Sequence, residues 1–218
     1  MKKFELTSEF VTFLGKKLFR IKALVAFGGV KEGELGGFVE KEENLDQSGD
    51  AWVSGNARVY GDARVYGNAR VSGNARVYGN ARVSGNAWVS GNAQVYGNAW
   101  VYGNALVSGD AQVYGDAWVY GDAQVYGDAW VYGAAWVYGN AWVQCCRDYS
   151  ATSCFGSENR TTTFFRTKDN GISVRCGCFY GTLEEFREKV KERHGDSRLA
   201  KEYLMLADLM EFRLSKDE

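Results

Sequence analysis

The stretch from Gly55 to Tyr78 reads GNARVYGDARVYGNARVSGNARVY. Gly, Ala and Val each recur at every sixth position, and Gly keeps this spacing from Gly49 to Gly139, which amounts to sixteen six-residue units. A fixed short period is typical of a solenoid, in which each unit buries its apolar side against its neighbours. We therefore predict a β-solenoid for residues 49–144, in a chain that is mainly β.

The residue types within a unit predict one short strand and one corner. Ala and Val lie two residues apart, so they share one face of a strand, and β-branched Val favours a strand. Gly followed by Asn or Asp supplies the bend. Trp recurs in every third unit from Trp100 to Trp136. Ser replaces Tyr in five units, and four of these five, all except Ser84, are spaced by three units from Ser54 to Ser108. Three units therefore make one triangular coil.

This pattern resembles the left-handed parallel β-helix of hexapeptide-repeat proteins, with Val in their aliphatic position, Ala in their small position and Asn or Asp at the turn. The left hand follows from the resemblance, because the period alone does not fix it. Residues 18–53 also resemble the entry segment of uncharacterised bacterial and prophage members, some of them named as acyltransferases; the motif from Glu34 to Val53 carries this likeness. We expect residues 1–48 to form an N-terminal cap with one irregular coil.

Residues 145–218 break the period and predict a small ββαα module. Two strands are expected over 161–167 and 171–179, joined by a turn that contains Asn-Gly. A helix follows, with Thr182 and Glu185 as its capping box and Gly195 at its end. A second helix is expected from about 197 to 213. The residues expected to face the core of the module are Leu183, Phe186, Val190, Leu199, Tyr203, Leu206, Leu209 and Met210.

Two groups of residues are candidates for binding. The first is an outward aromatic ladder on the solenoid, which can stack planar ligands or mediate association, or can simply reflect the preference of aromatic residues for strands. The second is the segment Phe155–Thr163, where backbone donors and an arginine can hold a phosphate or a carboxylate. The ladder consists of Trp100, Trp118, Trp136, Tyr102, Tyr120 and Tyr138; the loop residues are Gly156, Ser157, Asn159, Arg160 and Thr161.

Metal and catalytic chemistry have weaker support in the sequence. All five cysteines lie between Cys145 and Cys178, but no two of them form a C-x-x-C pair, and we expect reduced thiols with no metal and no cofactor. Hexapeptide-repeat acyltransferases use a His general base on or beside the coil, together with an extruded loop. The sixteen units contain neither, and the only histidine is His194.

Composition narrows the classes further. The chain has 218 residues and a formal net charge of −1, so bulk charge gives no nucleic-acid signal. The opening MKKFELTSEF lacks the apolar core of a signal peptide and no apolar run predicts a membrane helix, so we expect a cytoplasmic protein of a bacterial or infected bacterial cell.

We expect a non-catalytic interaction protein of bacterial or phage origin that binds a host or defence component and forms a dimer or trimer. A binder of a small anionic ligand such as a nucleotide and, by fold analogy, an acyltransferase are the alternatives.

Overall fold

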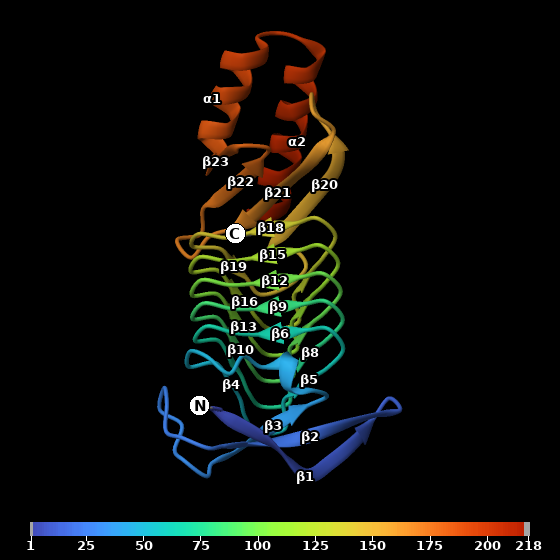
Figure 1. Cartoon of the computed structure of the whole chain (residues 1–218). Coiled ribbons are helices and arrows are strands. Elements are labelled where there is room, and N and C mark those ends of the chain that lie inside the picture. The colour runs from blue at the N-terminus through green and yellow to red at the C-terminus, as the bar shows by residue number, and fades with distance from the viewer. Residues whose placement is uncertain (1, 216–218) are drawn as a thin grey trace.

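A computed structural model describes residues 2–215 and shows three parts stacked along one axis (Figure 1). A β-hairpin and an irregular coil form the N-terminal end, a triangular solenoid forms the middle, and a sheet with two helices forms the C-terminal end. We call these parts the cap, the solenoid and the C-terminal module.

The solenoid is built from very short strands, each of which pairs in parallel with the strand three units further along the chain. Val59 pairs with Val77, for example, and Trp100 pairs with Trp118. The strands fall into three columns, β5-β8-β11-β14-β17, β4-β7-β10-β13-β16-β19 and β6-β9-β12-β15-β18, one for each side of the prism. The predicted parallel, three-sided solenoid with three units per coil is confirmed. Its strands are β4 (Trp52–Val53), β5 (Arg58–Val59), β6 (Arg64–Val65), β7 (Arg70–Val71), β8 (Arg76–Val77), β9 (Arg82–Val83), β10 (Trp88–Val89), β11 (Gln94–Val95), β12 (Trp100–Val101), β13 (Leu106–Val107), β14 (Gln112–Val113), β15 (Trp118–Val119), β16 (Gln124–Val125), β17 (Trp130–Val131), β18 (Trp136–Val137) and β19 (Trp142–Val143).

The repeat residues do what their chemistry predicts. The repeat Ala and Val side chains are completely buried and form one continuous core. The repeat glycines have φ between 64° and 73°, a left-handed conformation that favours Gly. A Cβ on Gly85 would also lie 2.9 Å from the amide nitrogen of Gly103, one coil further on. Glycine is therefore required both by the bend and by the close stacking of the coils.

Asparagine side chains run along the corners of the prism and hydrogen-bond from coil to coil. At one corner, Asn68 Nδ2 donates to Asn86 Oδ1 at 3.1 Å, Asn86 donates to Asn104 at 3.0 Å, and Asn104 donates to Asp122 at 2.9 Å. The other two corners carry the same kind of ladder, ending on Asp110 and Asp116. A carboxylate accepts but cannot donate when it is ionised, so each ladder ends at its aspartate.

The cap closes the first coil. Strands β1 (Phe4–Phe13) and β2 (Lys16–Ala23) form an antiparallel hairpin, and β3 (Leu35–Val39) joins β2 to the solenoid by pairing in parallel with β5. The irregular coil then passes through a 3-10 turn (Glu42–Asn44) and a bridge from Leu45 to Val65 before it reaches β4.

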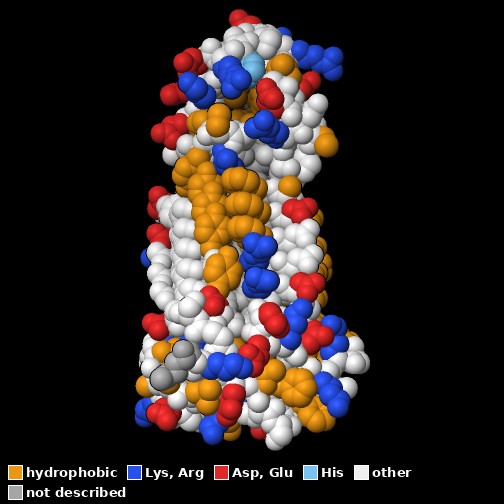
Figure 2. All heavy atoms as spheres, in the orientation of Figure 1, with side chains coloured by type: hydrophobic (Ala, Val, Ile, Leu, Met, Phe, Trp, Pro, Cys, Tyr) orange, Lys and Arg blue, Asp and Glu red, His pale blue; other side chains and the backbone are white. Residues whose placement is uncertain are grey.

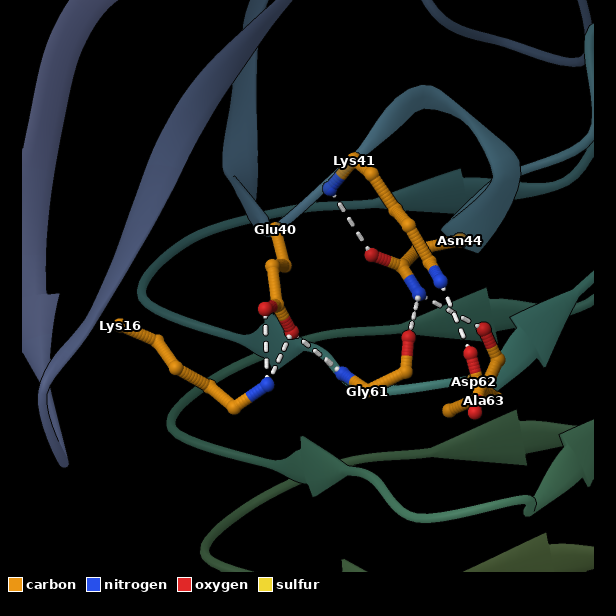
Figure 3. A network of polar contacts seen from close by, with 7 residues as sticks. All are labelled: Lys16, Glu40, Lys41, Asn44, Gly61, Asp62 and Ala63. Carbon is orange, nitrogen blue, oxygen red and sulfur yellow. Dashed lines mark hydrogen bonds and ion pairs between the residues drawn. The ribbon is translucent and has the colours of Figure 1, made fainter.

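Side chains of the cap satisfy backbone groups that the first regular coil would leave open (Figure 3). Buried Asn44 donates to the carbonyl oxygens of Gly61 and Ala63, at 3.0 and 2.9 Å. Glu40 accepts from the Gly61 amide at 2.6 Å and from Lys16 Nζ. Burial alone would raise the pKa of Glu40, but the hydrogen bonds from Lys16 and Gly61 lower it below its usual value. These contacts give the exposed coil edge the partners that a solenoid end needs.

The C-terminal module is a four-stranded antiparallel sheet covered by two helices. The order is β20 (Tyr149–Phe155), β21 (Arg160–Arg166), β22 (Ile172–Cys176) and β23 (Phe179–Thr182), followed by α1 (Leu183–His194) and α2 (Arg198–Leu214). Both helices and the capping box of Thr182 and Glu185 are confirmed.

Three details of the predicted module were wrong. The sheet contains β20 and β23 in addition to the two expected strands. The strand expected over 171–179 is interrupted, because Gly177 takes a φ of 57° and turns the chain into β23, which leaves Cys178 in the turn. Leu209 faces outward and Leu199 is only half-buried and outside the core, since the core side of α2 is already occupied by Tyr203, Leu206 and Met210.

The module is packed directly on the last coil. Phe165 of β21 is completely buried within the solenoid core. The Arg175 guanidinium lies 4.8 Å from the ring centre of Trp136, and the Tyr180 and Tyr138 ring centres are 4.3 Å apart. Backbone contacts add to this joint, because Lys168 donates its amide hydrogen to the Asn140 carbonyl at 3.0 Å.

Candidate functional site

The predicted aromatic ladder exists as two adjacent columns on one side of the solenoid. Figure 2 shows its apolar side chains gathered over β12, β15 and β18. The Trp100, Trp118 and Trp136 rings are parallel to within 4°, with successive centres 4.9 Å apart. Tyr102, Tyr120 and Tyr138 form the second column, with centres 4.8 and 4.5 Å apart. We call these six residues the aromatic face.

The rings of the aromatic face cover each other. Each tryptophan stacks on the next, and the two ends of the column are covered by Arg82, 4.9 Å from the Trp100 ring centre, and by Arg175 on Trp136. What reaches solvent from the tryptophan column is therefore mainly ring edges. Stacking of a sugar or a base needs a free ring face, so this geometry favours a structural role for the ladder.

The predicted anion-binding loop is a tight hairpin turn in which two of the backbone donors are already used. Gly156 and Asn159 both have positive φ, 72° and 49°, as the turn between β20 and β21 requires. The Ser157 amide donates to the Tyr203 hydroxyl at 3.0 Å, and the Asn159 amide points to the Gly156 carbonyl. The backbone of this turn therefore offers an anion fewer donors than expected, so an anion site here depends on side chains.

Two of the predicted loop residues line a cleft. Ser157 and Arg160 form part of a cavity of about 500 Å³ between the β20–β21 turn, the β22–β23 turn and α1. Gly156 is not a lining residue but lies directly against Tyr203, which is one. A Cβ on Gly156 would overlap the Tyr203 hydroxyl. Asn159 and Thr161 are not among its lining residues, and the Thr161 hydroxyl instead hydrogen-bonds with that of Ser153.

The floor of the cleft is aromatic. Phe186 and Tyr203 are buried beneath it, and Phe155 and Phe179 are half-buried at its sides. The rings meet at steep angles: 79° for Phe155 with Tyr203, 84° for Phe186 with Tyr203, and 52° for Phe179 with Phe186. His194, at the end of α1, packs on Tyr203 with ring centres 5.6 Å apart.

Three cations surround this floor. Arg160 comes from β21, and Lys189 and Arg193 come from the exposed side of α1. The guanidinium groups of Arg160 and Arg193 have no hydrogen bond or ion pair with any residue in the range 2–215, whereas Lys189 pairs with Glu192 at 2.6 Å. Glu158 is the only carboxylate among the described lining residues, so the cleft carries an excess of positive charge.

Sequence reasoning missed Lys189 and Arg193. The available signal was their spacing, because Phe186, Lys189 and Arg193 follow one another at intervals of three and four residues and so lie along one side of a helix. Nothing in the sequence places that side against Arg160.

Arg187 holds α1 and α2 together, since it hydrogen-bonds to Glu211 and Asp208 at 2.7 Å each. These hydrogen bonds raise the pKa of the Arg187 guanidinium above its usual value.

The cysteines do not converge on a metal site. All five are free. Within residues 2–215, no three His, Cys, Asp or Glu side chains are grouped as metal ligands would be. Cys176 accepts a hydrogen bond from the Thr162 hydroxyl, with oxygen and sulfur 3.3 Å apart, and lines the cleft together with Cys178.

Neither α1 nor α2, the helices of the described chain, has the length and apolarity to span a membrane.

Comparison with known families gives a match over the repeats. Seven segments, which together span residues 51–91 and 93–139, match the YdcK β-solenoid repeat. The match stops before the C-terminal module and does not include β1, β2 or β3 of the cap. No curated protein matches the chain. The solenoid thus has a family likeness, while the cleft must be interpreted from its own chemistry.

Proposed function

We propose that the protein is a non-catalytic binding protein, in which the solenoid is a rigid stalk and the C-terminal module is the binding element. The observation that carries this proposal is the cleft, where Arg160, Lys189 and Arg193 surround an aromatic floor. Cations around an apolar cavity suit a small ligand with an anionic group attached to an apolar body. The anchored joint at Phe165 supports a fixed position for the module on the stalk.

The surroundings of the only histidine favour binding over acyl transfer. Acyl transfer by analogy with hexapeptide-repeat enzymes would need a general base beside a groove of the coils. His194 instead belongs to the C-terminal module, where its ring lies against Tyr203. We therefore do not include catalysis in the proposed function. Release of coenzyme A by the wild-type protein that is lost in His194→Ala would contradict this.

A direct test uses 8-anilinonaphthalene-1-sulfonate, which combines an aromatic body with one anionic group. Its fluorescence should rise saturably on binding, and Arg160→Ala combined with Arg193→Ala should weaken binding at least ten-fold. Arg198→Ala is the matched control, because Arg198 is an exposed arginine of the same module outside the cleft. Equal affinity in the double variant and the wild type would refute the cleft as the anion site.

A second candidate function, interaction with another protein, is favoured by the outer side of α2. Met205, Leu209 and Phe212 lie one helical turn apart from each other and are 72%, 56% and 84% exposed. Their side chains point away from the core of the module. We propose a second copy of this chain as the occupant, because Glu202 and Arg213 lie on the same flank of the stripe, about three helical turns apart. An antiparallel pair would bring each of them opposite its complement.

A further inference from the structure

We infer that the ligand of the cleft is a free nucleotide, that is, a planar base joined through a sugar to one or two phosphates. This inference rests on the proposed function of the C-terminal module and narrows its ligand from any anion with an apolar body to one chemical class.

Two aromatic rings that line the cleft are not covered by another ring. Phe155 and Phe179 are half-buried, and each meets its aromatic neighbour at a steep angle. Among the described residues, no other ring stacks face to face on either of them. This is the opposite of the aromatic face of the solenoid, where each ring is covered by the next. A base stacks on a ring face that no other ring covers.

The charges favour a phosphate over a carboxylate. Two guanidinium groups, Arg160 and Arg193, lack partners within residues 2–215, and Lys189, which pairs with Glu192 at 2.6 Å, adds a third cation that a phosphate would share with that carboxylate. A carboxylate has one charge and two oxygens, which a single guanidinium fork satisfies, whereas a phosphate has three free oxygens and close to two charges. Three cations therefore fit a phosphate or diphosphate better. Glu158 can accept a hydrogen bond from an exocyclic amino group of a base.

Size and hydrogen bonding agree with this class. The cavity of about 500 Å³ falls in the range of small-molecule and cofactor sites. Tyr203 Oη accepts from the Ser157 amide, which leaves its hydroxyl proton available to a ligand oxygen. The floor and the cations lie in the same cavity, so one molecule with a flat end and a phosphorylated end can contact both.

The experiment is isothermal titration calorimetry of the full chain at fixed ionic strength. The probes are the 5′-monophosphates and 5′-diphosphates of adenosine, guanosine, cytidine and uridine, the free nucleosides, and inorganic phosphate. At least one nucleotide should bind ten-fold or more tightly than both its nucleoside and phosphate. Arg160→Ala should weaken that nucleotide and phosphate at least five-fold but leave the nucleoside unchanged. Phe179→Leu, which keeps an apolar side chain, should weaken nucleotide and nucleoside but not phosphate. Arg198→Ala should change nothing.

Several results would overturn the inference. If no nucleotide binds while the anilinonaphthalene sulfonate still binds through Arg160 and Arg193, the ligand belongs to another class and the proposed function stands. If neither binds, both fail. If inorganic phosphate binds as tightly as every nucleotide, the aromatic floor plays no part. A 5′-phosphorylated tetranucleotide that binds ten-fold more tightly than any mononucleotide would assign the cleft to nucleic-acid ends and refute a free nucleotide.

Discussion

Phe164 and Phe165 are neighbours in the chain, yet they are buried in two different cores. Phe164 packs with Phe186 and Val174 inside the C-terminal module, whereas Phe165 is buried in the core of the solenoid. Successive side chains of a strand point to opposite faces, so β21 is shared by both parts. The C-terminal module is therefore not a separate domain on a linker; β21 contributes to both cores and forms part of the joint with the stalk.

This relationship predicts different consequences for two adjacent substitutions. Phe164→Ala and Phe165→Ala should each cost about 3–5 kcal/mol, because both rings are fully buried. Phe165→Ala should loosen the joint but preserve the cleft, whereas Phe164→Ala should disrupt the cleft itself. Limited proteolysis between residues 144 and 149, compared with sulfonate binding, separates the two. Loss of ligand binding in Phe165→Ala with retained binding in Phe164→Ala would contradict the assignment.

Gly156 is predicted to be essential for the cleft in a way that Gly177 is not. Both have positive φ, 72° and 57°, so alanine at either position should cost about 1 kcal/mol in backbone strain. Only at Gly156 would the added methyl group overlap the Tyr203 hydroxyl, while nothing lies within 4 Å of a Cβ on Gly177. Gly156→Ala should therefore lower the melting temperature further and weaken sulfonate binding. Indistinguishable variants would show that the contact with Tyr203 is unimportant.

Whole coils should be removable from the stalk. Deletion of residues 85–102 removes one coil and leaves each column in phase, because every strand pairs with the one three units later. Deletion of residues 91–96 removes a single unit and should also fold, but it turns the C-terminal module by about 120° relative to the cap. Energy transfer between dyes on the cap and the module should distinguish the two deletions, and the affinity of the cleft should change in neither. Misfolding of the whole-coil deletion would refute the equivalence of the coils.

The partly buried tyrosines predict an alkaline limit to stability. Burial raises the pKa values of Tyr78, Tyr120 and Tyr149 above the ordinary value of 10.0. Each phenol therefore ionises more easily in the unfolded chain, so stability is complete below about pH 10 and falls as the pH rises above it. Denaturant unfolding at pH 8, 10 and 11, with phenolate absorbance recorded in parallel, measures this effect. Equal free energies of unfolding at pH 8 and 11 would contradict it.

Self-association is predicted through the outer side of α2. Phe212→Asp should abolish a dimer, because it places a charge at the most exposed apolar position of the stripe. Arg213→Glu should weaken the dimer, and Arg213→Glu combined with Glu202→Arg should restore it if the helices pair antiparallel. Light scattering at high micromolar concentration gives the mass. A wild-type monomer would rule out a second copy and leave this stripe to a different protein, such as a host component.

The repeated part of the chain could be predicted almost completely, and the cleft could not. The six-residue period determines which residues face inward, because Ala and Val occupy the same inward positions in every unit. The recurrence in every third unit sets the number of units in a coil. Strands β20 and β23 were missed because YSATSCF contains few apolar residues and FYGT is short and includes a glycine. Leu209 was placed inward because α2 carries apolar residues on both sides. The cleft depends on tertiary packing that brings Arg160 to Arg193, which local patterns do not encode.

The irregular coil of the cap has a consequence for how the chain folds. The regular coils are so alike that any one of them could pair with the wrong neighbour at little local cost. The coil that contains Asn44 and Leu45 has a sequence of its own, and it contacts the first regular units. We expect this coil to fix the position at which the first regular coil begins. Because the N-terminal end of the chain leaves the ribosome first, the coils can fold one after another from this end. Each coil would then pair with its correct neighbour before the following coils, which have nearly the same sequence, are synthesised.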